Sequence, residues 1–322
     1  MNALFLRYGK PVKVDWTAWR TLADCDDMWI RLFFATAELG GWNATVQMCG
    51  KPQTTRFTPR QTLQWTERFG LDDKVDVLWV RGRYGYPPAL DRHKSAYKVF
   101  LPCGSAIDVA PDRGFDLVCV DSEMQIHAAA QRFKGARIMV LPKPAIGDIF
   151  KPVRTQKDRD VVFNCHRLDD FKGYSWLVER LPAGTKVLRI GPKDRWFAAA
   201  QHLDVEWTGK IDIRDVPAQA CRAKVGVVCD DGKWDSGPRI LPEFLAMNIP
   251  VIVRNTVRAS RMYVGPETGA WVDDNVARFH ATLKCLLHDA AFMRTRDYYV
   301  DHMSLSVTAN RLHRAITEDV VT

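Results

Sequence analysis

Short apolar runs alternate with amphipathic segments along the whole chain. Runs of this kind, bounded by polar or turn residues, are typical of buried β-strands. They predict strands at 3–7, 45–48, 75–80, 97–102, 116–120 and 137–141 in the first half, and at 161–164, 186–190, 205–207, 225–229 and 250–253 in the second.

Segments with helical spacing of their apolar residues lie between and after these strands. They predict helices at 28–39, 173–181, 217–222, 277–287, 290–299 and 306–317. Strands that alternate with helices indicate a parallel α/β sheet in each half. We therefore expect two domains, at 1–150 and 151–300, and a C-terminal helix at 301–322 that packs back on the first domain. The stretch 141–160, rich in proline and charge, is interpreted as the interdomain connection.

The segment 235–253, DSGPRILPEFLAMNIPVIV, predicts a ligand-facing loop, a short helix and a buried strand. Gly237 allows the backbone to approach a ligand closely, and Pro238 and Pro242 suit a first helical turn, whose amides have no partner within the helix. A helix that begins near residue 239 would direct its amide hydrogens and its positive dipole end at an anion. An ordinary joint between a strand and a helix is the alternative.

The end of this helix is also marked in the sequence. Arg239 and Glu243 stand four residues apart, on one helical face. Asn248 suits a left-handed helix end, Pro250 forbids continuation, and 251–253 fits a buried parallel strand.

A second anion-binding loop is predicted within 163–181, where Arg167 and Lys172 follow a strand and precede Gly173. Arginine offers a bidentate fork to a phosphate, and lysine offers a compact point charge. Taken alone, this loop is explained more simply by two solvated side chains. Because the predicted helix start at 239 belongs to the same domain, the two segments together predict a pyrophosphate site.

The composition bounds the class of protein. The chain has 322 residues, 47% of them hydrophobic, which is enough for two domain cores. Its eight cysteines, at 25, 49, 103, 119, 165, 221, 229 and 285, include no CxxC pair. This pattern favours reduced thiols and a cytoplasmic protein. No apolar run approaches the roughly 20 residues that span a bilayer, and the first residues lack a signal-peptide core, so any membrane contact is expected to be peripheral.

The formal net charge of +8 favours an anionic partner such as a nucleotide, a nucleic acid or a lipid headgroup. Within 51–98, ten Lys and Arg residues stand against five Asp and Glu residues. The aromatic residues interleaved with them are Phe57, Trp65, Phe69, Trp79, Tyr84, Tyr86 and Tyr97. Such a mixture suits a polyanion that carries stackable rings. Solvated loops over aromatic core residues are the alternative.

The two predicted anion-binding segments resemble the motifs of a known family. Arg167-Leu168 and Lys172-Gly173 resemble the GRLxxxKG loop of the retaining GT-B glycosyltransferases of family 4, also called group 1. Asp235 and Glu243, separated by seven residues, resemble the E-x7-E motif of that family. Further similarities lie at 116–122, 141–152 and 207–210, so the resemblance covers roughly 115–275.

The resemblance implies an α/β protein of GT-B fold, with two Rossmann-like domains whose parallel sheets face a central cleft. The first domain would bind the acceptor, and the second would bind a nucleotide-diphosphate sugar, such as a UDP-sugar, as a substrate rather than a cofactor. Arg167 and Lys172 would bind the diphosphate, and Asp235 would contact the transferred sugar. The implied catalytic residues are thus Asp235, Arg167 and Lys172, and the implied donor-binding residues are Glu243 at the ribose, Gly237, Pro238 and Arg239 at the diphosphate, and Gly191, Gly209 and Lys210 near the base.

Several positions depart from the family pattern. Asp235 stands where glutamate is usual, His166 where glycine precedes the loop arginine, and Asn248 where glycine ends the helix. The His-Gly of the family aligns with Cys103-Gly104, so the histidine on the acceptor side is missing. The remaining candidates for a base, each more simply structural, are Asp91, His93, Asp108 and Asp121.

Two acidic pairs resemble metal-binding patterns. Asp24-Cys25-Asp26 is a DxD sequence, but its position before the helix at 28–39 favours N-capping. Asp230-Asp231 follows a strand, where acidic residues usually cap a helix or face solvent. No spacing of His, Cys and Asp residues resembles a zinc site. We therefore expect a metal-independent reaction.

The sequence predicts a hexosyl- or pentosyltransferase that moves a sugar, with retention, from a nucleotide diphosphate to an acceptor hydroxyl. The acceptor is a glycan or lipid-linked saccharide, or else a hydroxymethylated base in DNA, because 51–98 is basic and 208–211 resembles phage DNA-glucosylating enzymes. Such an enzyme would act in the cytoplasm of a bacterium or of a phage-infected cell. The alternatives are a nucleotide-sugar epimerase and a non-catalytic protein that binds nucleotide sugars, the latter suggested by Cys103.

Overall fold

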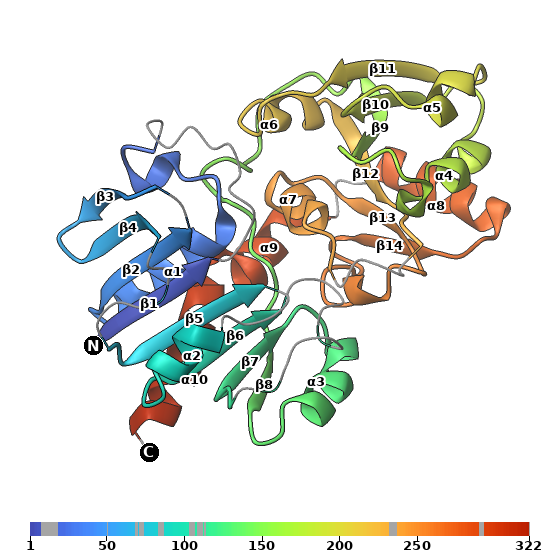
Figure 1. The fold of residues 1–322 in the computed structure, drawn as a ribbon. Coiled ribbons are helices and arrows are strands. Elements are labelled where there is room, and N and C mark those ends of the chain that lie inside the picture. Colours follow the sequence, from blue (N-terminus) through green and yellow to red (C-terminus); the bar gives the residue numbers. More distant parts are fainter. Residues whose placement is uncertain are drawn as a thin grey trace. The chain divides into compact units, whose positions relative to one another are not determined.

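The computed structural model describes residues 1–7, 19–49, 51–67, 70, 74–82, 87–102, 107, 112, 114–231, 237–289 and 293–321. The chain divides into two units. The first consists of Met1–Pro142 and Leu305–Thr322, and the second of Lys143–Ser304. Each unit is built on one sheet whose strands are mostly parallel, with helices on its faces (Figure 1). The α/β class predicted from the alternation of strands and helices is confirmed.

The first unit contains an eight-stranded sheet in the order β3-β4-β2-β1-β5-β6-β7-β8. Its strands are β1 (Asn2–Arg7), β2 (Asn43–Cys49), β3 (Gln53–Thr58), β4 (Gln61–Thr66), β5 (Val77–Gly82), β6 (Tyr97–Pro102), β7 (Leu117–Val120) and β8 (Arg137–Val140). Neighbours are parallel except at the edge, where β3 runs antiparallel to β4. The hairpin of β3 and β4 was not predicted, because β3 is largely exposed and carries polar side chains instead of an apolar run.

Helices cover both faces of this sheet. They are α1 (Met28–Leu39), α2 (Pro87–Arg92), α3 (Ile126–Arg132) and α10 (Leu305–Val321). On one face, Phe5 and Trp79 of the sheet pack against Phe33 of α1, and α10 lies against α1 (Figure 1). On the other face, residues of α2 and α3 join the apolar cluster that contains Leu78 and Phe100.

The interpretation that Asp24-Cys25-Asp26 caps α1 is wrong, because a neighbouring residue is the N-cap. The N-cap of α1 is the next acid, Asp27, whose carboxylate accepts from the amides of Trp29 and Ile30. Asp24 instead accepts from the amide and the hydroxyl of Thr21. The helix itself has the predicted bounds of 28–39.

The second unit contains a six-stranded, wholly parallel sheet in the order β11-β10-β9-β12-β13-β14. Its strands are β9 (Arg159–Asn164), β10 (Lys186–Ile190), β11 (Asp204–Gly209), β12 (Ala223–Val228), β13 (Val251–Arg254) and β14 (Gly269–Val272). All but β14 were predicted. This last strand, GAWV, begins with glycine and is only partly buried, so it lacks the apolar run that marks the other strands.

The helices of the second unit are α4 (Tyr174–Arg180), α5 (Arg195–Ala199), α6 (Val216–Ala220), α7 (Ile240–Ala246), α8 (Val276–Asp289) and α9 (Thr295–Met303). Residues of α4, α5 and α8 share one apolar cluster with β9, β10, β12, β13 and β14. Helix α7 contacts β12, β13 and α9. The predicted helix 290–299 overlaps α9, and its residues 290–292 lie outside the described part of the chain.

The aromatic residues of 51–98 serve mainly as packing groups where they are described. Trp65 and Trp79 are buried. The Phe57 ring makes an edge contact with Phe34, and the Tyr97 hydroxyl donates to the Asp319 carboxylate. Phe69, Tyr84 and Tyr86 lie outside the described residues. The alternative of core aromatics therefore describes these four residues better than a stacking surface does.

The seven cysteines in the described part of the chain are free thiols. Across the same residues, every helix is too short or too polar to cross a bilayer.

Candidate functional site

The predicted site residues that the structure describes lie at the carboxyl ends of the strands of the six-stranded sheet. Strand β9 lies in the middle of the sheet, where the chain first adds β10 and β11 on one side and then β12, β13 and β14 on the other. At such a switch in strand order, the loops after the two central strands diverge and leave a crevice for a ligand. Here these are the loops after β9 and after β12, which contain Arg167, Lys172 and the residues that lead to α7.

Two cations and one aromatic ring form the surface of the loop after β9. The Arg167 side chain is 65% exposed and pairs with Asp169 at 3.0 Å. Lys172 is more enclosed, with its Nζ 3.9 Å from Oδ2 of the buried Asp230. The centre of the Phe171 ring lies 4.7 Å from the Arg167 guanidinium carbon and 5.0 Å from the Lys172 Nζ. Both cations therefore contact the same aromatic ring.

The loops after β9 and β12 are joined through their backbones. The Asp231 amide donates to the Phe171 carbonyl at 2.8 Å. Gly173 has φ of 80°, and a Cβ at this position would lie 2.0 Å from the carbonyl oxygen of Cys229. Only glycine permits this approach, so α4 can begin directly beside the end of β12. The structure thus brings Lys172 next to Asp230, 58 residues later in the sequence.

The first turn of α7 carries a largely buried carboxylate. Glu243 lies 3.9 Å from Arg239, the four-residue spacing predicted for one helical face, and its side chain is 12% exposed. Burial raises the pKa of Glu243 from 4.5 to about 7, and Arg239 offsets part of this effect. The acid is therefore held close to its point of ionisation at neutral pH.

The loop before α7 is anchored by a residue that the sequence did not single out. Gly237 and Pro238 are buried, and the Gly237 carbonyl accepts from the Nζ of the buried Lys143 at 2.8 Å. The only sequence signal for Lys143 was a cation in an otherwise apolar stretch. Asp235, the predicted sugar contact, lies outside the described residues.

The sequence predicts an anion site at the N-terminus of α7. The helix has seven residues, with Arg239 at its N-cap. The Leu241 amide, in the first turn, donates to the Pro238 carbonyl at 3.2 Å. The end of the helix is as predicted, because Asn248 adopts φ of 59° before β13 begins.

Gly191 and Gly209, the residues predicted near a base, lie side by side. The Gly191 amide donates to the Gly209 carbonyl at 3.0 Å. Gly191 has φ of 128°, and a Cβ there would lie 2.1 Å from the Cys165 carbonyl oxygen. The loop after β10 therefore packs directly on the loop after β9.

Further cations surround His166. Burial lowers the pKa of its imidazole, and the neighbouring charges of Arg189, Lys210 and Arg239 lower it further. Lys210 and Arg239 come from different loops, yet both lie near enough to repel the protonated ring. Cations from three different parts of the chain therefore lie near His166 at this end of the sheet.

The candidates for a catalytic base in the first unit differ in their exposure. Asp91 is exposed on α2, whereas His93 and Asp121 are buried. Asp108 and Cys103-Gly104 lie outside the described residues. Within the described ranges of both units, no three His, Cys, Asp or Glu side chains are grouped closely enough to hold a metal ion.

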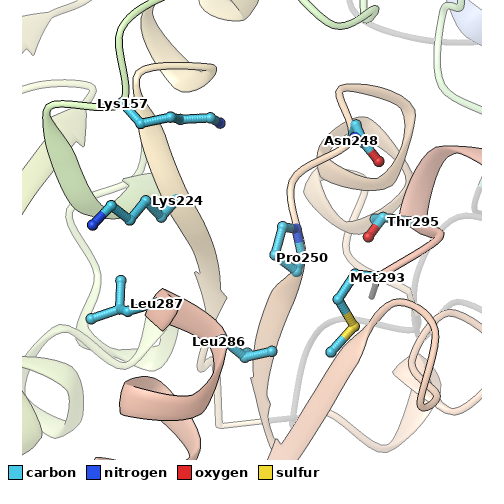
Figure 2. Close-up of a pocket in the computed structure, with 8 residues that line it drawn as sticks. All are labelled: Lys157, Lys224, Asn248, Pro250, Leu286, Leu287, Met293 and Thr295. Carbon is cyan, nitrogen blue, oxygen red and sulfur yellow. The ribbon is translucent and has the colours of Figure 1, made fainter. Parts of the chain in front are cut away.

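A cavity of about 190 Å³ lies at the opposite end of the six-stranded sheet, beside the amino ends of its strands (Figure 2). It is lined by Lys157, Lys224, Asn248, Pro250, Leu286, Leu287, Met293 and Thr295. Lys157 precedes β9 and Pro250 precedes β13, so the cavity belongs to the amino ends of the strands. It is therefore separate from the loop that contains Arg167.

The fold matches solved structures over its full length, although no family model and no curated protein matches the chain. Sucrose-phosphate synthase from Thermosynechococcus elongatus is 14% identical, with a TM-score of 0.69 over 99% of both chains. Anabaena HepE in complex with UDP is 12% identical, with a TM-score of 0.67 over 99% of this chain and 100% of that one. The lipopolysaccharide outer core galactosyltransferase WaaB is 12% identical, with a TM-score of 0.65 over the same shares.

These matches include both units and both sheets. The chain therefore has the GT-B fold, as the resemblance of its two loops to retaining family 4 glycosyltransferases predicted.

Proposed function

We propose that the protein is a glycosyltransferase that binds a nucleotide-diphosphate sugar at the carboxyl edge of the six-stranded sheet. The observation that carries this proposal is the loop after β9, which presents Arg167 and Lys172 at the switch in strand order, with Lys172 beside Asp230 of the loop after β12. A structural neighbour supports the choice of ligand, because HepE has been solved with UDP and glucose.

Arg167 and Lys172 are proposed to bind the diphosphate. Negative charge grows on the leaving diphosphate as its bond to the sugar breaks, and fixed cations stabilise that charge. Arg167 can exchange the exposed Asp169 for phosphate oxygens at little cost, since a solvent-exposed ion pair is worth about 1 kcal/mol or less. With two cations in this role, we infer a metal-independent reaction.

Glu243 is proposed to accept hydrogen bonds from the ribose hydroxyls. An ionised carboxylate is a two-oxygen acceptor and suits a vicinal diol. Asp235 would contact the hydroxyls of the transferred sugar, with Gly237, Pro238 and Arg239 assisting at the diphosphate. The paired loops at Gly191 and Gly209, with Lys210, would receive the base.

The proposed reaction replaces one bond at the anomeric carbon with another, on the same face of the sugar. The bond to the diphosphate oxygen breaks, a bond to the acceptor oxygen forms, and the acceptor proton passes to the leaving diphosphate. We propose a saccharide hydroxyl as the acceptor, held by the first unit, because Trp65 and Trp79 are buried and not available to stack on nucleic acid bases.

The test combines nucleotide binding with product analysis. Wild-type protein is titrated with UDP, GDP, ADP and dTDP, then incubated with the matching nucleotide sugars and a panel of saccharides and hydroxymethylated duplex DNA, with mass detection. Arg167→Ala should weaken nucleotide binding about tenfold to a hundredfold, the range for hydrogen bonds to charged groups. Arg294→Ala is the matched control, because Arg294 is 64% exposed and also pairs with a nearby aspartate, Asp297, but precedes α9.

Two results would overturn the proposal. One is a wild-type protein that binds no nucleoside diphosphate. The other is transfer that survives the loss of both Arg167 and Glu243. Donor binding without any product across the panel would instead favour the non-catalytic alternative, and a change in the sugar without acceptor would favour an epimerase.

A further inference from the structure

A buried ion pair lies beneath the loop after β9. Arg189 is fully buried in β10, and its Nε donates to the Asp194 carboxylate at 2.9 Å, with both side chains 0% exposed. An arginine in the interior of a parallel sheet is costly unless all of its donors are satisfied. The Nη1 of Arg189 donates to the Ile190 carbonyl, and its Nη2 donates to the Tyr174 hydroxyl at 2.7 Å.

Tyr174 extends this pair to the surface loop. Its hydroxyl accepts from Arg189 and donates to the Arg167 carbonyl. Burial raises the pKa of the Tyr174 phenol far above its ordinary value, so the hydroxyl keeps the proton that it donates. The ring is fixed as well, because it stacks on Trp196 at 4.8 Å and makes an edge contact with Phe163 at 5.1 Å.

The other end of the pair reaches a different loop. The Asp194 carboxylate accepts from the Phe197 amide at 2.9 Å and so caps α5. Asp194 follows Gly191 in the loop after β10, which packs on Cys165. The chain Asp194–Arg189–Tyr174–Arg167 therefore links the loop proposed for the base to the loop proposed for the diphosphate.

We infer that Tyr174, held by Arg189 and Asp194, is a positioning residue that fixes the backbone of the diphosphate loop at Arg167 before the donor arrives. This inference rests on the proposed donor site. A loop that is already ordered loses less conformational entropy when it binds, so the affinity for the donor is higher. The Arg167 side chain can then still change rotamer, while the Tyr174 hydroxyl fixes the Arg167 backbone at its carbonyl.

The first experiment needs no ligand. Amide hydrogen exchange is compared among wild type, Tyr174→Phe and Tyr298→Phe. The control residue Tyr298 also donates a hydrogen bond from its hydroxyl to a backbone carbonyl in the same unit, that of Met262 at 3.0 Å. Peptides that contain residues 165–173 should exchange at least about threefold faster in Tyr174→Phe than in wild type, since loss of a local hydrogen bond favours local opening. In Tyr298→Phe their exchange rate should equal that of wild type.

The second experiment uses whichever of UDP, GDP, ADP or dTDP binds wild type most tightly. Tyr174→Phe should weaken its affinity about threefold to tenfold, the effect of one hydrogen bond. In an Arg167→Ala background, Tyr174→Phe should lower the affinity by about twofold or less, because the side chain that Tyr174 positions is gone. Should Tyr174→Phe fail to fold, Asp194→Asn, which weakens the hold on Arg189, takes its place in both experiments.

The outcomes separate this inference from the proposed function. Unchanged exchange at 165–173, or an affinity loss of equal size with and without Arg167, overturns the positioning role. If wild type binds no nucleoside diphosphate, the proposed function fails, and the exchange comparison still decides whether Tyr174 holds the loop.

Discussion

Replacing Glu243 with glutamine should stabilise the protein and impair its proposed function at once. The Glu243 side chain is 12% exposed, and its burial raises the pKa from 4.5 to about 7 despite Arg239 at 3.9 Å. A glutamine has nearly the same shape but no charge to desolvate. The substitution therefore removes the cost of ionising this acid in the folded protein.

The sign and the size of the effect follow from proton linkage. Between pH 4.5 and about 7 the folded protein binds more protons at this site than the unfolded chain does, so the free energy of unfolding falls as the pH rises. Above pH 7 the full penalty applies, about 3 kcal/mol for a pKa shift of this size. Glu243→Gln should thus be about 3 kcal/mol more stable than wild type at pH 8, and about 1 kcal/mol or less at pH 5.

Urea unfolding at pH 5 and pH 8 measures this difference. Glu179→Gln is the control, because the Glu179 side chain is 69% exposed on α4 and should show the same small effect at both pH values. A gain from Glu243→Gln that does not depend on pH would refute the reasoning, and so would a loss of stability at pH 8.

The same acid should make donor binding depend on pH. If Glu243 accepts hydrogen bonds from the ribose as a carboxylate, the bound state requires its ionised form. Binding should then release a proton near pH 6.5, and affinity should fall as the pH drops below about 7. Calorimetric titration with a nucleoside diphosphate in two buffers of different ionisation enthalpy measures the proton release. Glu243→Gln should bind more weakly and release no proton from this site.

Three further predictions concern the backbone of the second unit. Gly173→Ala should destabilise the protein by more than about 2 kcal/mol and weaken nucleotide binding, because the new Cβ would lie 2.0 Å from the Cys229 carbonyl oxygen. Gly184→Ala is the control, because Gly184 has a similar φ of 79° but open space around it. It should destabilise the protein by only about 1 kcal/mol and leave nucleotide binding unchanged. Asn248→Ala should cost about 1–2 kcal/mol in urea unfolding, and Asn248→Gly less, since the position has φ of 59°. Lys143→Met should weaken nucleotide binding about threefold to tenfold, because it removes the 2.8 Å hydrogen bond to the Gly237 carbonyl. Binding equal to that of wild type would argue against an anchoring role for Lys143.

The sequence predicted most of the second sheet because strands buried on both faces must be apolar. The runs at β9, β10, β12 and β13 were visible for this reason. Strand β3 was missed because a half-exposed edge hairpin can be built from polar residues. Arg189 gave no signal, since a charged residue in a strand is normally placed at the surface and its partners cannot be read from the sequence.

The sequence by itself determined the local geometry of the site. The order of strand, loop and helix placed Arg167 and Lys172 after β9, and Asn248 and Pro250 ended α7, because each depends on the backbone preferences of a few adjacent residues. Tertiary structure decided which distant groups meet: parallel pairing of β9 with β12 brought Lys172 to Asp230, and packing desolvated Glu243. Proximity and burial arise from long-range packing, so neither can be read from local sequence.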